Sequence, residues 1–202
     1  ILLTFDDGYF DNYKYAYPIL KQLKIPAVCF LITDAICEHK RTSYEFTLKP
    51  HAQIDYKKDP EHFLTLDEIR QMSDIFDFDS HTATHFSCKS DDEVRLKNEF
   101  SISLLKIQEL FLDKKEFGFC WPRGHFNESA INLAKSKFDF AFTTIDGGYY
   151  KDDDKFKIRR VDISSNSKDD DTYIRRLKRK ILVYSMPFIG KLYSNYRNRK
   201  FK

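Results

Sequence analysis

The chain has 202 residues, of which 42% are hydrophobic and 32% are charged, a balance typical of one globular domain with a substantial core. The formal net charge of +3 hides an uneven distribution, because residues 174–202 hold ten basic and no acidic residues, whereas the rest holds 24 basic and 31 acidic residues. An acidic body lacks the basic stripe of a nucleic-acid-binding domain, so we expect no nucleic-acid partner.

The N-terminal part alternates between short apolar runs and an amphipathic segment. We predict strands at residues 1–5 and 27–32 and, between them, a helix over about 13–23. The helix would place four apolar side chains on one face: Ala16, Ile19, Leu20 and Leu23.

Residues 36–62 are polar and irregular, and they look like a long surface excursion. Long loops in compact domains often carry binding function. The excursion holds three histidines without a motif around them, His39, His51 and His62, and we expect these to be solvated.

The remaining chain continues the alternation of strands and helices. Capping boxes predict helices from Thr65 to about Ser73 and from Ser90 to about Leu112. Further elements are predicted from the apolar patterns: strands at 75–79, 117–121 and 138–144, a helix at 128–135, and a possible strand at 158–163. Such alternation favours parallel strands with crossover helices, and in barrels of that kind the catalytic groups lie at the C-terminal strand ends.

The four cysteines show no CxxC pair and no regular spacing. Cys29 and Cys120 fall within apolar strand patterns, where a buried free thiol is the simpler interpretation. We therefore expect no disulfide framework.

Polar residues with metal-binding chemistry follow two of the predicted strands. Asp6 and Asp7 come directly after the first, and Gly8 permits a turn through which both carboxylates reach one cavity. His81 and His85 share a face if their segment makes a helical turn. Two imidazoles and one carboxylate suit a catalytic divalent metal, zinc first and cobalt, nickel or iron as alternatives, and leave the second carboxylate free to take a proton.

A third motif, Pro122–Gly124, also follows a predicted strand end. Together with Thr4–Gly8 and Ser80–His85 it resembles the first three motifs of the polysaccharide deacetylases, the NodB-homology family or carbohydrate esterase family 4. The resemblance implies an α/β fold, a distorted (β/α) barrel with fewer than eight repeats, over residues 1–165. Residues 166–202 would then form a basic C-terminal helical tail.

The sequence around the motifs is similar to one branch of that family. Residues 64–69 and 140–144 resemble the branch of poly-N-acetylglucosamine deacetylases and enzymes of surface-polysaccharide synthesis. The resemblance implies metal-dependent removal of N-acetyl groups from amino sugars of a surface polysaccharide or its precursor. An N-acetylated glycan is accordingly the expected substrate.

The resemblance also implies roles for single residues. Asp6 matches the catalytic base, and the backbone N–H of Arg123 matches a donor to the oxyanion. Three side chains match the metal ligands: Asp7, His81 and His85.

Substrate contacts and departures from the family concern the third motif. We expect Pro122, Trp121 and His125 to contact substrate, with core packing as the open alternative for Trp121. Cys120 stands where much of the family has an arginine that orients the base, a substitution shared by the poly-N-acetylglucosamine branch. No histidine follows His125. Some members of the family it resembles have a permuted motif order, which would place the general acid upstream of Ile1.

The basic tail leaves further alternatives open. Residues 175–202 mix basic clusters with apolar runs and resemble an interfacial segment resting on anionic lipid, or a terminal helix packed on the barrel. A glycan-binding barrel without turnover, and a hydrolase of another C–N amide bond, are the alternative functions. The family implies a cell-envelope or extracytoplasmic location, whereas unpaired cysteines are compatible with the cytoplasm; oligomeric state is not predicted.

Overall fold

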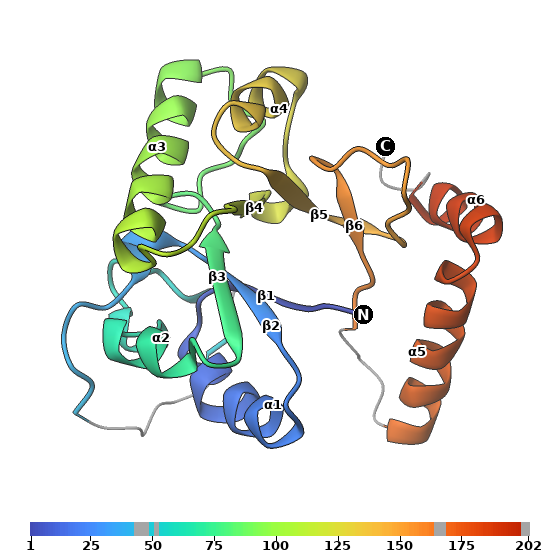
Figure 1. The fold of residues 1–202 in the computed structure, drawn as a ribbon, viewed down its shortest axis with the longest axis horizontal. Coiled ribbons are helices and arrows are strands. Elements are labelled where there is room, and N and C mark those ends of the chain that lie inside the picture. The colour runs from blue at the N-terminus through green and yellow to red at the C-terminus, as the bar shows by residue number, and fades with distance from the viewer. Residues whose placement is uncertain (43–48, 51–52, 164–168, 199–202) are drawn as a thin grey trace. The chain divides into compact units, whose positions relative to one another are not determined.

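A computed structural model describes residues 1–42, 49–50, 53–163 and 169–198 (Figure 1). The chain divides into two compact units, Ile1–Asp139 and Phe140–Lys202. This division lies upstream of the boundary predicted at residue 165. Each unit is described by itself.

Parallel strands form the centre of the first unit. They lie in sequence order: β1 (Leu3–Asp7), β2 (Ala27–Leu31), β3 (Phe76–Ser80) and β4 (Gly118–Cys120). Leu3 pairs with Ala27, and Ala27 pairs with Phe76, so the first three strands are in register over their whole length. Because the strands are parallel, their C-terminal ends meet at one edge, and this is where the predicted site residues lie.

Helices connect these strands, as parallel pairing requires. In chain order they are η1 (Asn12–Ala16), α1 (Tyr17–Leu23), η2 (Thr33–Ala35), η4 (Pro60–His62), α2 (Leu66–Met72), α3 (Glu93–Leu110), η5 (Pro122–Gly124) and α4 (Glu128–Lys135). Figure 1 shows α1 following β1, α2 leading into β3, and the long helix α3 joining β3 to β4. The predicted alternation of strands and helices is confirmed.

Caps explain where three of the helices begin. The capping box at Thr65 is present, with both reciprocal bonds to Glu68. The second predicted box is wrong in detail, because Asp92 caps α3 by accepting from Arg95 N, while the Ser90 hydroxyl accepts from Asp92 N. Helix α4 spans the predicted residues and is capped by Asn127.

The first helical segment differs from the prediction. Residues Asn12–Ala16 form a π-helix, and a regular α-helix begins only at Tyr17. A π-turn holds more residues than an α-turn, which rotates the buried face. Tyr17 and Leu20 are buried, whereas Ile19 is 57% exposed and Leu23 is 59% exposed, so the predicted face is wrong for those two residues.

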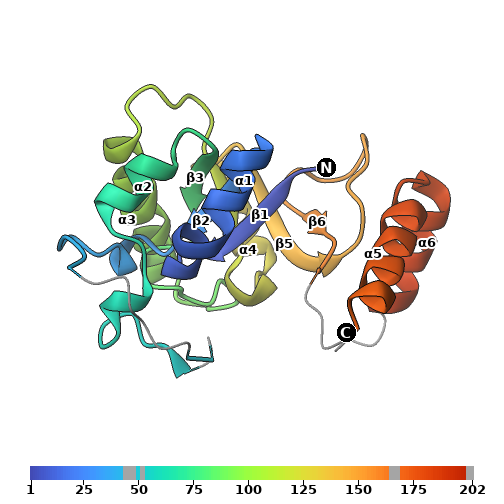
Figure 2. The same cartoon turned by 90° about the horizontal axis from the view of Figure 1, so that it is seen from below.

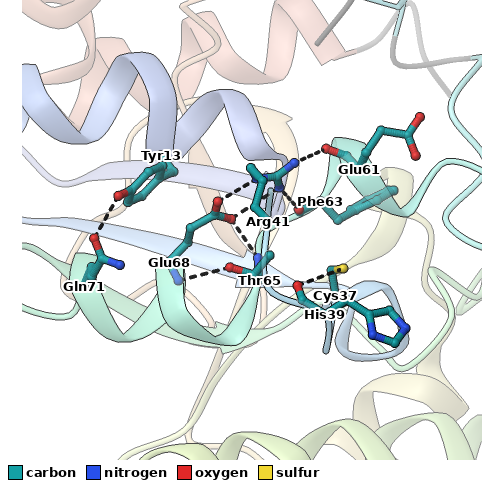
Figure 3. Close-up of polar contacts among 9 residues, drawn as sticks. All are labelled: Tyr13, Cys37, His39, Arg41, Glu61, Phe63, Thr65, Glu68 and Gln71. Atoms are coloured by element: carbon teal, nitrogen blue, oxygen red, sulfur yellow. Dashed lines mark hydrogen bonds and ion pairs between the residues drawn. The ribbon is translucent and has the colours of Figure 1, made fainter. Parts of the chain in front are cut away.

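An arginine fastens the two ends of the polar excursion to helix α2. Arg41 pairs with the buried carboxylate of Glu68 at 2.6 Å and donates to the carbonyl oxygens of Glu61 and Phe63 at 2.8 and 2.7 Å (Figure 3). Its guanidinium also lies 3.6 Å from the ring centroid of Phe10. Loss of either partner would leave a charge uncompensated in a site where both side chains are less than a tenth exposed.

The cysteines follow the prediction. All four are free thiols, with Cys37 half-buried and Cys29, Cys88 and Cys120 buried.

The second unit pairs two parallel strands with the two tail helices. It comprises β5 (Phe140–Asp146), β6 (Ile158–Arg160), α5 (Asp170–Tyr184) and α6 (Pro187–Asn198). Helices α5 and α6 pack on each other through Tyr184 and Tyr193, whose ring centroids are 5.7 Å apart (Figure 2). Pro187 begins α6, a position where its missing N–H costs no helical hydrogen bond.

One carboxylate anchors both tail helices to the end of β5. Asp146 accepts from the Tyr184 hydroxyl at 3.0 Å and pairs with Lys180 at 3.2 Å and Arg197 at 3.0 Å. Part of the basic charge of the tail is thus neutralised within its own unit. Over the described residues, no helix has both the length and the apolar character needed to cross a bilayer.

Candidate active site and metal centre

Backbone conformations that are unfavourable for side-chain-bearing residues concentrate at the C-terminal strand edge. Among the described residues other than glycine, five have positive φ: Asp7 (70°), Thr82 (65°), His85 (58°), Arg123 (55°) and Lys24 (54°). The first four belong to the three predicted motifs. The left-handed conformation costs roughly 1–2 kcal/mol per residue. Such strain gathers at functional sites, where the surrounding structure imposes it.

Three potential ligand atoms converge in this strained region. Asp7 Oδ1 lies 3.4 Å from His81 Nε2 and 3.4 Å from His85 Nε2. The Asp7 oxygen is buried and has no hydrogen-bond partner among the described residues. The structure brings together the three side chains named as candidate ligands, and the arrangement is one that can hold a metal ion.

The hydrogen bonding of His81 decides which of its nitrogens is available. Its Nδ1 lies 2.7 Å from the carbonyl oxygen of Cys120. A carbonyl oxygen only accepts hydrogen bonds, so Nδ1 carries the proton and the lone pair is on Nε2, which faces Asp7. A backbone carbonyl on the distal nitrogen is the usual way in which proteins orient a metal-binding histidine.

The environment of the second imidazole, His85, favours its neutral form. Burial, together with the nearby His81, lowers the pKa of His85 to about 4. Two imidazole nitrogens therefore face a carboxylate oxygen over 3.4 Å, a spacing that a cation between them would stabilise. Neutral imidazole and ionised carboxylate are the protonation states that ligate a metal, so these residues fit a divalent cation.

The second carboxylate lies beside this cluster. Potential ligand atoms of Asp6, His81 and Cys120 all lie within 4.8 Å of one another. Asp6 is therefore adjacent to the Asp7 cluster without belonging to it, as a proton acceptor next to a metal would be.

Helix α3 supports the loop that carries His81 and His85 through hydrogen bonds. Thr84, between the two histidines, donates from its backbone N–H and from its hydroxyl to the carboxylate of Glu99, at 2.9 and 2.6 Å. The Ser80 and Ser103 hydroxyl oxygens lie 2.7 Å apart. Ser80 and Thr84 thus support the loop that carries the ligands. The sequence analysis missed Glu99 and Ser103, although both are polar residues on the buried face of an amphipathic helix.

Tyr9 is a further site residue that the sequence analysis missed. Its phenol hydrogen-bonds to the Asp7 carboxylate, and burial together with that negative charge raises the pKa of Tyr9 above its usual value. The ring packs on Phe63 with centroids 5.1 Å apart. The only signal in the sequence is its place immediately after Gly8.

The third motif forms a tight turn beside the cluster. Gly124 N donates to Trp121 O at 2.8 Å, and His125 N donates to Pro122 O at 3.0 Å. Arg123 lies at the exposed tip of this turn, and His125 is partly exposed with Nδ1 3.3 Å from the Ser87 hydroxyl.

The predicted substrate contact through Trp121 is wrong for this structure. Its side chain is 0% exposed and packs edge-to-face on Phe119 and Phe100, with centroids 4.9 and 6.2 Å apart. The alternative interpretation, core packing, holds because a large aromatic between two buried rings gains more from the core than from a rim.

The three histidines of the polar excursion have different outcomes with respect to the predicted solvent exposure. His39 is exposed, as expected, and His51 lies outside the described residues. His62 is only 4% exposed, which contradicts the expectation that it is solvated. It closes the 3₁₀-helix η4, where the chain returns to the core.

Comparison with known proteins agrees with this geometry. The family model described as polysaccharide deacetylase matches residues 1–138. The chain belongs to the polysaccharide deacetylase family. The matched residues contain all three motifs and all the candidate metal ligands.

Two curated relatives are similar over most of this chain. A candidate polysaccharide deacetylase of Bacillus subtilis (YxkH) is 27% identical over 166 residues, covering 81% of this chain and 51% of the relative. A poly-β-1,6-N-acetyl-D-glucosamine N-deacetylase of Staphylococcus epidermidis is 26% identical over 175 residues, covering 83% of this chain and 55% of the relative. The chain thus spans about half the length of the curated relatives that it matches.

A solved structure shows the same fold. The de-N-acetylase from Aggregatibacter actinomycetemcomitans superposes with a TM-score of 0.66 at 26% identity, covering 87% of this chain and 74% of that chain. The predicted fold class, an α/β fold of the NodB-homology barrel type, is confirmed by this likeness.

Proposed function

We propose that this family member is a metal-dependent hydrolase that removes N-acetyl groups from amino sugars of a surface polysaccharide or its precursor. The observation that carries the proposal is the buried Asp7 oxygen facing the Nε2 atoms of His81 and His85, with Asp6 alongside. The printed name of the Staphylococcus epidermidis relative, a poly-β-1,6-N-acetyl-D-glucosamine N-deacetylase, supports the choice of substrate class.

Asp7, His81 and His85 would hold the metal, with zinc as the first choice because nitrogen and oxygen ligands in this number suit it. Cobalt, nickel or iron are alternatives with the same ligand types. A divalent cation there supplies Lewis acidity, which acidifies water and polarises a carbonyl group.

The protein residues then perform the proton transfers and the charge stabilisation. Asp6 accepts the proton of the water that attacks the acetamide carbon, because its carboxylate lies next to His81 and is not one of the three side chains that would hold the metal. The backbone N–H of Arg123 donates to the oxygen that becomes negative. The proton that Asp6 took from the water passes to the nitrogen as the C–N bond breaks, which releases the amine and acetic acid. His125 lies on the partly exposed side of the turn and would contact substrate, whereas Pro122 is buried, contrary to the expected contact.

The test separates the two carboxylates. Asp6→Asn should retain bound metal and lose acetate release from N-acetylglucosamine oligomers, whereas Asp7→Ala should lose both. Asp113→Asn, a surface carboxylate exchanged in the same way, is the control and should match wild type. Normal turnover by Asp6→Asn would overturn the assignment of the base.

A glycan-binding barrel without turnover is the alternative function. It would retain metal and bind oligomers with no acetate release under any condition. Release of a different acyl or amine product instead would favour a hydrolase of another C–N amide bond. Analysis of the released products distinguishes these two alternatives.

We further propose that the tail contacts a membrane surface. Phe188, Leu192 and Tyr196 recur every four residues along α6 and are 78%, 57% and 66% exposed. On α5 three exposed cations, Arg176, Lys178 and Arg179, form no ion pair with a described residue. Exposed apolar side chains and exposed cations on the two helices of one unit suit an anionic lipid surface.

Vesicle sedimentation tests this contact. Vesicles containing phosphatidylserine should bind the protein, neutral vesicles should not, and a Phe188→Ser/Leu192→Ser variant should bind less. Equal partitioning of wild type and variant would contradict the proposal.

A further inference from the structure

The first motif ends in a strained turn. Asp7 has φ 70° and Gly8 has φ +77°, and Gly8 N donates to Asp6 O at 2.9 Å. A residue with a side chain adopts this left-handed conformation only where the neighbouring structure imposes it. Since Asp7 offers a ligand atom to the cluster with the two histidines, whatever holds the turn also holds that carboxylate.

The chain directly after the polar excursion pairs with this turn. Leu64 N donates to Gly8 O at 2.9 Å, and Tyr9 forms an antiparallel bridge with Phe63. The rings of Tyr9 and Phe63 also pack on each other, with centroids 5.1 Å apart. The segment therefore contacts the turn through its backbone and through the ring of the residue that follows Gly8.

Arg41 contacts both sides of that bridge. Its guanidinium donates to Phe63 O at 2.7 Å (Figure 3). The same group lies 3.6 Å from the ring centroid of Phe10, which follows Tyr9 in the chain. A planar cation can donate in its plane and stack on a ring with its face, and here it does both. One side chain thus links the two strands of the bridge.

Helix α2 fixes the arginine itself. Arg41 donates to the Glu68 carboxylate from Nε at 2.6 Å and from Nη2 at 3.3 Å (Figure 3). The Arg41 side chain is 7% exposed and the Glu68 side chain is 3% exposed. Glu68 also accepts from Thr65 N at 2.8 Å within the capping box. Two bonds to one buried carboxylate fix the plane of the guanidinium, so the start of α2 sets its orientation at the bridge.

We propose that Arg41 is a positioning residue for the metal centre. By fixing the bridge between Tyr9 and Phe63, it holds the turn that carries Asp7 and directs the Asp7 carboxylate towards the two histidines. The inference rests on the proposed function and extends it to a residue that is not among the candidate ligands. It predicts that the affinity of the folded protein for metal depends on Arg41.

The test separates positioning from stability. Arg41→Lys keeps the charge but loses the planar fork that reaches two acceptors and a ring at once. Tyr17→Phe is the control, because it keeps the ring and removes a hydroxyl that joins α1 to α2 through Gln71 O at 2.6 Å. Zinc affinity is measured against a chromophoric chelator at a temperature where each variant is folded, and Tm is measured by circular dichroism.

Both variants should have a lower Tm, but only one should lose metal affinity. Arg41→Lys should bind zinc about tenfold more weakly, as is common when residues that support metal ligands are changed. Tyr17→Phe should bind zinc as wild type does. A lower Tm with unchanged zinc affinity in Arg41→Lys would overturn the inference.

A second variant serves if Arg41→Lys does not fold. Glu68→Gln keeps an oxygen that can accept from Thr65 N and loses the charge that orients Arg41. Its zinc affinity should fall between those of wild type and Arg41→Lys. Wild-type affinity in Glu68→Gln would contradict the role given to the arginine.

Amide hydrogen exchange gives a readout that requires no metal. The Leu64 N–H, bonded to Gly8 O, should exchange several-fold faster in Arg41→Lys than in wild type, because its partner strand is held less firmly. The Ala27 N–H, bonded to Ile75 O at the start of β2, is the control and should exchange at the same rate in both proteins. Equal exchange of the Leu64 amide in both proteins would show that Arg41 does not hold the turn.

The outcomes also separate this inference from the proposed function. If Arg41→Lys binds zinc as tightly as wild type while wild type releases acetate, only the role of Arg41 is wrong. If zinc affinity follows the predicted order and no acetate is released, the deacetylase proposal is wrong and the positioning role stands.

Discussion

Removal of the Glu99 carboxylate should loosen the loop that carries both histidines. Glu99 is 5% exposed and accepts from the Thr84 N–H at 2.9 Å and from the Thr84 hydroxyl at 2.6 Å. Hydrogen bonds to charged groups contribute roughly 1.5–3 kcal/mol each, from which the cost of burying the carboxylate must be subtracted. We therefore expect Glu99→Ala to lower the free energy of unfolding by about 3 kcal/mol.

For a chain of this length, that loss corresponds to a fall in Tm of about 6–12 °C. Mutation of residues that support metal ligands typically lowers metal affinity about 10–100-fold. We therefore expect the zinc affinity of Glu99→Ala to fall by about 10–100-fold. Thermal unfolding by circular dichroism and a zinc titration against a chromophoric chelator measure the two effects.

Two variants calibrate the result. Glu99→Gln keeps one oxygen as an acceptor and should lie between wild type and Glu99→Ala. Glu109→Ala removes an exposed carboxylate of the same helix and should behave as wild type. A Glu99→Ala protein with unchanged Tm and unchanged zinc affinity would refute the idea that α3 supports the loop.

Three further predictions concern the backbone, the thiols and the tryptophan. Gly8→Ala should destabilise the fold by about 1–3 kcal/mol and weaken metal binding, because Gly8 has φ +77° and an added Cβ would come 2.7 Å from a leucine methyl group of β2. An unchanged free energy of unfolding in chemical denaturation would contradict this. Burial raises the pKa of the Cys29 and Cys88 thiols, so at pH 8 a thiol reagent should modify chiefly the half-buried Cys37 of the native protein. Rapid modification of all four cysteines before unfolding would contradict the structure. Trp121, the only tryptophan, should emit at short wavelength and respond neither to iodide nor to added glycan oligomers.

Periodicity and motif spacing were sufficient to predict most of the elements and the convergence of Asp7, His81 and His85 at one strand edge. Apolar runs and capping residues located the strands and helices to within a few residues, as at α4. The adjacent carboxylates and the paired histidines could be assigned to one site because parallel strands bring their C-terminal ends to one edge.

The parts that could not be predicted depend on tertiary contacts. The π-helix before Tyr17 rotates a helical face, and the hydrophobic pattern does not reveal that rotation. The carbonyl of Cys120 fixes the proton on His81, but a backbone group has no signature in a sequence. Trp121 precedes the third motif in the chain, yet only the packing of its neighbours shows that it faces the core.

The most direct test of the metal centre is elemental analysis of bound metal per chain, for wild type beside His81→Ala/His85→Ala. The geometry predicts near-stoichiometric divalent metal in wild type and its loss in the double variant. Wild-type protein that binds no metal after zinc or cobalt is supplied, or a double variant that retains it, would contradict the account.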